Sequence, residues 1–179
     1  MTTTLTLPVT LAAKDGSPFV VRAMQPADRP ALEAMYDAFE PKRAAQGLPP
    51  RHLADVRRWL DRVLASGRHL LVEVDGRIRG HVMLIPIDER AVELANFLHQ
   101  AVRDRGIGTT ANAVALALAR DAGRQRVWLS VEPSNRAAVR SYEKVGFRRL
   151  PGSLWNPEIE MEVALADWRP DQFLRFVTA

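Results

Sequence analysis

The feature that most constrains the fold is a charged turn with two glycines that leads directly into an apolar helix. The segment RDRGIGTTANAVALALAR, residues 103–120, passes through Gly106 and Gly108 into a run of alanine and leucine. Glycine permits backbone conformations that turn several N–H groups toward one place. The start of a helix adds unsatisfied N–H donors and the positive end of the helix dipole. The segment therefore predicts an anion site of the kind that holds phosphate or pyrophosphate.

Two familiar phosphate-binding motifs compete for this turn. A P-loop needs GxxxxGK[ST], and it is excluded because no lysine follows the glycines. A dinucleotide fingerprint is met literally by GIGTTA at residues 106–111, and Glu132 ends the next expected strand, where an acidic ribose ligand belongs. Against the fingerprint, residues 99–105 separate the glycines from the preceding strand, and too little chain follows for a full nucleotide domain.

The hydrophobic patterns along the chain predict a mixed sheet with helices on its faces. Asp75-Gly76 marks a hairpin within residues 69–87, and Lys14-Asp15-Gly16 marks a second turn between two short strands. We expect the order β-β-α-α-β-β-β-α-β-α-β-β, with helices in residues 25–40, 51–67, 108–123 and 134–146, and strands in residues 9–24, 69–87, 91–102, 126–131, 147–150 and 159–165.

Particular residues sharpen these predictions. Asp28 is expected to cap the first helix, and Ser134 or Asn135 the last. Gly67 and Gly146 are expected to end helices. The nearly continuous apolar run RVWLSV, residues 126–131, is typical of a strand buried on both faces.

Composition narrows the class of protein. The 179 residues suit one domain, and the absence of cysteine excludes disulfides, thiolate metal sites and a cysteine nucleophile. The net charge of +4 is spread among interspersed acidic residues, so we expect no nucleic-acid partner. No apolar stretch is long enough to span a bilayer and no signal peptide is apparent, so we expect a cytoplasmic location without membrane contact. No metal-binding spacing is present, and the four tryptophans, including Trp155, are scattered.

The turn and its flanks resemble a known family. RDRGIG fits the signature [RQ]xxGxG of the GNAT superfamily, the acyl-CoA-dependent N-acyltransferases, and residues 92–111 resemble its strand, loop and helix for the coenzyme A pyrophosphate. VEPSNRAAVRSYEKVGFRR, residues 131–149, resembles the family's second motif, with matches at Asn135, Ala138, Tyr142, Gly146 and Phe147. The resemblance implies a GNAT fold of the α/β (α+β) class: a mixed, mostly antiparallel central sheet flanked by about four helices. We expect residues 1–18 to form an N-terminal strand packed on a single GNAT domain at residues 19–179.

The resemblance also implies a reaction. An acetyl group moves from acetyl-CoA to a primary amine by direct attack, without a metal. Glu93 is expected to act as the base, directly or through a water, with His99 and Asn96 as lesser candidates, and Tyr142 to protonate the leaving thiolate. Backbone N–H groups near Leu98 and His99 are expected to meet the thioester carbonyl. The expected cofactor-binding residues are Leu98, His99, Arg103, Asp104, Arg105, Gly106, Ile107, Gly108, Thr109, Asn135 and Tyr142.

Several alternatives stay open at this stage. Asn135 is either a cofactor ligand or a plain helix cap, and the arginines meet phosphate or form surface ion pairs. The acceptor is a small molecule, a peptide N-terminus or a protein lysine, and residues 41–50 are either a lid over it or a solvated loop. A homodimer stays open as the oligomeric state. Rival functions are a noncatalytic acyl-CoA sensor and a nucleotide-dependent oxidoreductase using GIGTTA.

Overall fold

One mostly antiparallel sheet carries the fold of this computed structural model, which describes residues 4–42, 48–152, 157–174 and 176–177. In these residues the sheet has eight strands in the order β1-β2-β3-β4-β5-β6-β8-β7, and only β5 and β6 pair in parallel. The strands are β1 (Val9–Ala12), β2 (Pro18–Ala23), β3 (Arg68–Val74), β4 (Arg77–Pro86), β5 (Ala91–Leu98), β6 (Arg126–Val131), β7 (Arg148–Arg149) and β8 (Ile159–Ala164).

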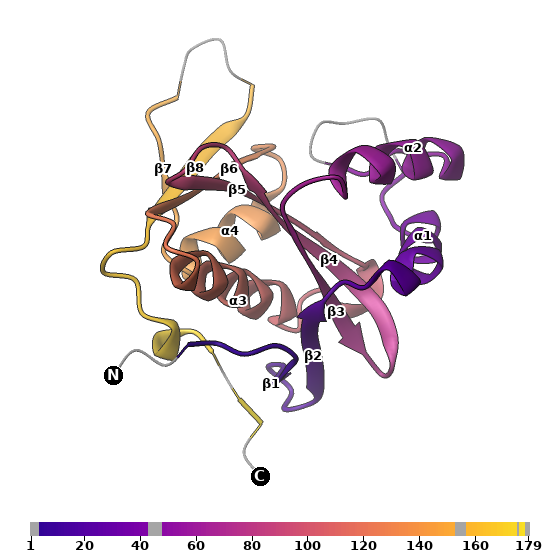
Figure 1. Ribbon diagram of the computed structural model, residues 1–179, viewed down its shortest axis with the longest axis horizontal. Helices are drawn as coiled ribbons and strands as arrows, with labels where there is room; N and C mark the ends of the chain where they lie inside the picture. Colours follow the sequence, from indigo (N-terminus) through magenta and orange to yellow (C-terminus); the bar gives the residue numbers. More distant parts are fainter. Residues whose placement is uncertain (1–3, 43–47, 153–156, 175, 178–179) are drawn as a thin grey trace.

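Among the residues described, four α-helices cover the two faces of the sheet (Figure 1). One face packs against α1 (Arg29–Asp37) and α2 (Leu53–Val63), and the other against α3 (Ile107–Asp121) and α4 (Arg136–Lys144). Short 3-10 helices lie at Pro26–Asp28, Gln100–Val102 and Pro170–Gln172. Helix α3 is the most deeply buried of the four, since its alanines and leucines are buried almost all round, as a helix in the middle of a core requires.

The predicted fold class and element order are confirmed. Asp75 and Gly76 both take the left-handed conformation, with φ of 52° and 68°, which a two-residue hairpin turn of type I′ needs. Gly146 has positive φ just past the C-cap of α4 and so ends that helix as expected, and Gly123 does the same for α3. Gly67 also has positive φ, but α2 already ends at Val63, so the expectation that Gly67 ends this helix is wrong.

Two further local predictions differ from the structure. Asp28 makes no side-chain cap on α1, because its carboxylate accepts hydrogen bonds from the Arg22 guanidinium at 2.7 Å and from the Gln25 amide at 2.7 Å. Residues 100–102 form a 3-10 helix rather than the end of a strand. Residues 43–47 of the segment 41–50, which is either a lid or a solvated loop, lie outside the described residues, as does Trp155.

The prediction that β6 is buried on both faces is also wrong. Val127, Leu129 and Val131 are buried against the α3 side, but Trp128 and Ser130 on the opposite face are only partly covered. Helices α1 and α2 pack on β3, β4 and β5 and do not extend over β6. Because β6 is largely apolar, its sequence does not indicate that one face is less covered than the other. That less covered face makes the sheet accessible beside β5.

Candidate active site

The glycine turn forms a cradle of backbone N–H groups. Asp104 and Gly106 both have positive φ, 60° and 78°, so the chain reverses twice before α3 begins at Ile107. The first helical bond of α3 is donated by Thr110 to the Gly106 carbonyl at 3.1 Å. Among the described residues, none accepts a hydrogen bond from the N–H groups of residues 104–109. This run of donors at the positive end of a 15-residue helix has the geometry of an anion site.

Beside the cradle, strands β5 and β6 separate. Their parallel pairing covers only Ala91 to Glu93 on β5 and Arg126 to Trp128 on β6. From Leu94 onward β5 pairs with β4 alone, while β6 continues along β8. Where two neighbouring strands stop pairing, the backbone N–H and C=O groups along the gap lack hydrogen-bond partners in the sheet. The opening therefore offers backbone groups to a chain-like ligand that enters between the two strands.

The hydrogen-bond alternation of β4 and β5 shows which backbone groups face the opening. His99 donates to the Arg79 carbonyl at 2.8 Å and Ile87 donates to the Ala91 carbonyl at 3.0 Å, which marks odd-numbered β5 residues as bonded to β4. Since bonded pairs alternate along an antiparallel ladder, Leu94, Asn96 and Leu98 direct their backbone groups toward β6. The expectation that the His99 amide meets a thioester carbonyl does not fit this pairing, whereas the expectation for Leu98 does.

Glu93 lies where the two strands part. It pairs with Ile85 on β4 and Trp128 on β6, with no register shift between β4 and β5. By strand alternation its side chain shares a face with Ala95 and Phe97, which pack toward α1 and α2. Burial, and secondarily the Glu158 carboxylate, raises the pKa of Glu93. A half-buried carboxylate of raised pKa is a better proton acceptor than an exposed one.

Tyr142 and Asn135 both belong to α4. The Tyr142 ring packs edge-on against Phe147 at 5.7 Å between ring centroids, and burial raises the pKa of its hydroxyl to about 12. That hydroxyl makes no hydrogen bond to any residue in the described part of the chain. Asn135 accepts a hydrogen bond from the Ala138 amide at 3.2 Å, so its side chain caps α4. Of the two expectations for Asn135, the cap is the one realised here.

The two arginines of the turn are held by protein groups. Arg103 donates to the Leu98 carbonyl at 2.9 Å and to the Glu40 carbonyl, and its guanidinium lies 5.1 Å from the centre of the Phe39 ring. Arg105 pairs with Asp15 at 3.2 Å and donates to the Ser17 hydroxyl. Both side chains therefore brace the turn in this structure instead of facing its N–H donors.

Sequence reasoning missed a polar network next to the opening. Asn96 Nδ2 donates to Asn112 Oδ1 at 2.7 Å, Asn112 Nδ2 donates to the Ser141 hydroxyl at 3.3 Å, and that hydroxyl is 2.9 Å from the Thr109 hydroxyl. The network joins β5, α3 and α4, and it holds the Thr109 side chain against α4. Asn112, 1% exposed within an otherwise apolar helix, was the available signal, because a buried amide needs partners.

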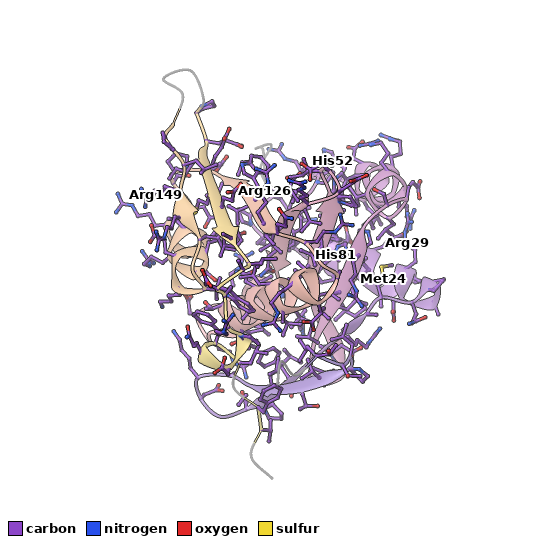
Figure 2. All side chains as sticks on the ribbon, turned by 60° about the vertical axis from the view of Figure 1, so that its left-hand side comes forward. Met24, Arg29, His52, His81, Arg126 and Arg149 are labelled. Atoms are coloured by element: carbon purple, nitrogen blue, oxygen red, sulfur yellow. The ribbon has the colours of Figure 1, made fainter. Side chains whose placement is uncertain are left out.

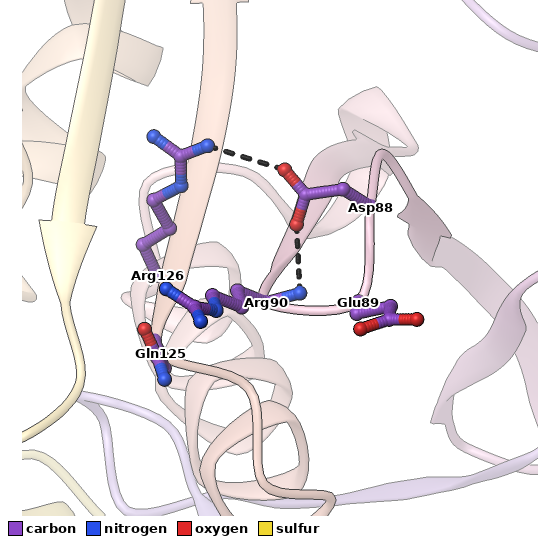
Figure 3. Close-up of a pocket in the computed structure, with 5 residues that line it drawn as sticks. All are labelled: Asp88, Glu89, Arg90, Gln125 and Arg126. Atoms are coloured by element: carbon purple, nitrogen blue, oxygen red, sulfur yellow. Dashed lines mark hydrogen bonds and ion pairs between the residues drawn. The ribbon is translucent and has the colours of Figure 1, made fainter.

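Other parts of the surface do not compete as sites. The depression between residues 88–90 and 125–126 lies at the opposite end of β5 from the glycine turn, and the Asp88–Arg126 ion pair at 3.3 Å spans it (Figure 3). Arg149 points outward from the molecule, in contrast to the buried His81 (Figure 2). Within the described ranges, no group of histidine and acidic side chains is arranged to hold a metal ion. None of the helices described has the length and apolarity to cross a membrane.

Comparisons with known proteins agree with this geometry. A family model described as the acetyltransferase (GNAT) family matches residues 32–147. Uncharacterized N-acetyltransferases of Mycobacterium tuberculosis and Mycobacterium bovis are 39% identical over 98 residues, which is 54% of this chain and 57% of theirs. The match thus spans little more than half the length of these curated relatives.

Solved structures share the fold. The GNAT domain of S. lividans PAT superposes with a TM-score of 0.70 at 18% identity, over 88% of this chain and 97% of that one. Mycobacterium smegmatis RimJ, in complex with CoA-disulfide, gives 0.71 at 14% identity over 94% and 96%. The putative acetyltransferase yncA from Salmonella typhimurium, with its cofactor acetyl-CoA, gives 0.66 at 18% identity over 83% and 95%.

Proposed function

The chain belongs to the GNAT acetyltransferase family, and from that premise we propose that it transfers an acetyl group from acetyl-CoA to a primary amine by direct attack. The observation that carries the proposal is the N–H cradle of residues 104–109 next to the opening between β5 and β6. The cradle fits a pyrophosphate, and the opening fits the pantetheine arm that follows it. A dinucleotide-binding fold is built on a mostly parallel sheet, whereas in the part of the chain that the structure describes only β5 and β6 pair in parallel, and a 3-10 helix precedes the glycines.

In the proposed reaction, Glu93 accepts the proton that the amine must lose. A lysine amine has a pKa of about 10.4 and an α-amine about 7.7–8.0, so the attacking nitrogen needs a base. Glu93 stands at the point where the strands part, and its raised pKa suits proton acceptance. The amine nitrogen forms a bond to the carbonyl carbon, and its proton passes to Glu93 directly or through one water.

The oxyanion that forms on the carbonyl oxygen needs hydrogen-bond donors already in place. The backbone N–H groups of Leu94, Asn96 and Leu98 face the opening, and the strand holds them without side-chain rearrangement. We assign the thioester carbonyl oxygen to a position where these backbone N–H groups donate hydrogen bonds to it. Collapse of the intermediate then breaks the carbon–sulfur bond and releases the thiolate of coenzyme A.

Tyr142 stabilises that thiolate. With a pKa of about 12 the hydroxyl is fully protonated at neutral pH. A thiol has a pKa of about 8.5, so complete transfer of the tyrosine proton is uphill by roughly 5 kcal/mol. Tyr142 therefore acts mainly as a hydrogen-bond donor to the sulfur, and the proton that finally neutralises the thiolate comes from solvent.

Calorimetric binding of acetyl-CoA, desulfo-CoA and NADH tests the proposal. An added Cβ at Gly108 sits 3.5 Å from Leu98 and 3.9 Å from Asn96, so a tryptophan there fills the space that the ligand needs. We expect micromolar binding of both CoA ligands, no binding of NADH, and loss of CoA binding in Gly108→Trp. Gly152→Trp is the matched control, because no atom of the described residues lies within 4 Å of its Cβ position.

The outcomes separate the rival functions. If the wild-type protein binds NADH and no CoA ligand, the acetyltransferase proposal is wrong. If the protein binds acetyl-CoA but releases no thiol with any small amine, peptide or protein acceptor, the noncatalytic acyl-CoA sensor is the function that remains. The acceptor amine would reach Glu93 over the partly covered sheet face beside Trp128, on the α1 and α2 side. The screen of small amines, peptides and proteins identifies which acceptor is used.

A further inference from the structure

The N-terminal hairpin is docked on the glycine turn. The Lys14 amide donates to the Arg105 carbonyl at 2.9 Å, and Asp15 pairs with the Arg105 guanidinium at 3.2 Å. Ser17 completes the contact, since its hydroxyl accepts from Arg105. Lys14, Asp15 and Ser17 of the β1–β2 turn thus all contact Arg105 of the cradle, which lies about 90 positions later in the chain.

This docking lays the stem of Lys14 across Gly106. A Cβ built on Gly106 would lie 2.8 Å from Lys14 Cγ, 3.4 Å from Cδ and 3.2 Å from Cε. Three methylene groups therefore run over the residue that caps α3, and the ammonium group lies one bond farther on. Gly106 is needed twice, for its φ of 78° and for the room that the lysine stem takes.

We propose that Lys14 supplies the side-chain cation of the phosphate site, binding a phosphate of the coenzyme A donor held on the N–H cradle. The inference rests on the proposed function and adds to it a ligand from outside the glycine motif. Lysine is a mobile point charge on a flexible stem, which suits an exposed phosphate whose position is fixed by backbone donors.

The surrounding charges favour Lys14 over the arginines of the motif. Arg105 is bound to Asp15 and Ser17, and Arg103 is bound to two backbone carbonyls and stacked on Phe39. Lys14 is exposed and forms no ion pair with any residue that the structure describes. The arginines therefore shape the turn, and the lysine is left with its charge available to a ligand.

Two of the three lysines of the chain, Lys14 and Lys144, provide the test and its control. Lys14→Met keeps the stem over Gly106 and removes the charge, Lys14→Arg keeps a charge, and Lys144→Met removes an exposed charge at the end of α4. We expect Lys14→Met to bind acetyl-CoA about tenfold more weakly by calorimetry, as the loss of one charge-assisted hydrogen bond predicts. The dependence of its affinity on salt should also be shallower than in wild type. Lys14→Arg and Lys144→Met should bind nearly as wild type.

Each other outcome is decisive. If wild type binds no acetyl-CoA, the proposed function fails and the role of Lys14 fails with it. If wild type binds and Lys14→Met binds equally well or more tightly, only the role of Lys14 is overturned. Equal weakening in Lys14→Met and Lys14→Arg, with unchanged melting temperatures, assigns the loss to stem packing and likewise overturns it.

Discussion

Each face of the central sheet contains one buried tyrosine, and the two differ in what their hydroxyls do. Tyr36 on α1 is 1% exposed, and its hydroxyl is 2.8 Å from His81 Nδ1. Tyr142 on α4 is 8% exposed, and its hydroxyl bonds to no described residue. A buried polar group that is fully bonded belongs to the folded core, whereas one left without a partner beside an opening is available for chemistry.

The Tyr36 hydroxyl belongs to a hydrogen-bonded chain with a defined direction. His69 Nε2 is 2.9 Å from the Ser66 carbonyl, which only accepts, so Nε2 carries the proton and Nδ1 accepts. His81 Nε2, 3.0 Å away, must then donate to His69, and His81 Nδ1 accepts from Tyr36. In this arrangement every ring nitrogen of the two histidines has a hydrogen-bond partner.

The comparison indicates that the α1 and α2 face stabilises the fold, whereas the α3 and α4 face leaves a tyrosine hydroxyl available for the reaction. The α3 and α4 face is built mostly from alanine, valine and leucine, and the tyrosine hydroxyl that has no partner among the described residues lies on α4, the helix after β6. The α1 and α2 face is aromatic, with Trp59 and Phe97 packed edge-on to Tyr36 at 5.2 and 5.8 Å between centroids. The following changes separate the two tyrosines by experiment.

The largest effect is expected from Tyr142→Phe. Loss of a positioned hydrogen-bond donor to the leaving thiolate should lower kcat by about 10²–10³. Unfolding free energy should change little, because the hydroxyl has no partner among the described residues to lose. Thiol release from acetyl-CoA with a saturating acceptor, together with urea unfolding, measures both. A large loss of stability with normal kcat would reverse the assignment of the two faces.

Tyr36→Phe should show the opposite pattern. It leaves His81 Nδ1 buried without a donor, and His81 is 0% exposed. The unfolding free energy should fall by about 1–3 kcal/mol, the usual cost of a buried unsatisfied group. We expect acetyl-CoA affinity to be unchanged at temperatures where the variant is folded. Weakened binding in a fully folded variant would contradict a purely structural role.

Acid should destabilise the protein through the same chain. Burial, and secondarily the nearby His69, lowers the pKa of His81 from 6.5 to about 3. Below pH 6.5 the unfolded chain therefore binds a proton that the folded protein refuses, and stability falls as pH falls toward 3. The slope from this one group is about 1.4 kcal/mol per pH unit. Urea unfolding at pH 4.5 to 7.5 measures it, and His81→Gln should flatten the slope while His52→Gln, at an exposed position, should not. An identical slope in all three proteins would disprove the role of His81.

Much of the fold was predictable because its signals are local. Glycines that need positive φ mark the turns at Gly67, Gly76 and Gly146, and hydrophobic periodicity marks the helices between them. The cradle was predictable for the same reason, since it comes from consecutive backbone groups of residues 104–109. The motif around Tyr142 likewise lies within one helix and its cap.

The sequence by itself determined the elements, their order and the anion-binding turn, because these depend on neighbours along the chain. Only the tertiary structure decided which groups remain available at the site. Pairing with β4 occupies the His99 amide, the N-terminal hairpin occupies Arg105, and α1 and α2 stop short of β6. These facts depend on contacts between residues far apart in sequence, and a hydrogen bond or ion pair made at such a distance leaves no periodicity to detect.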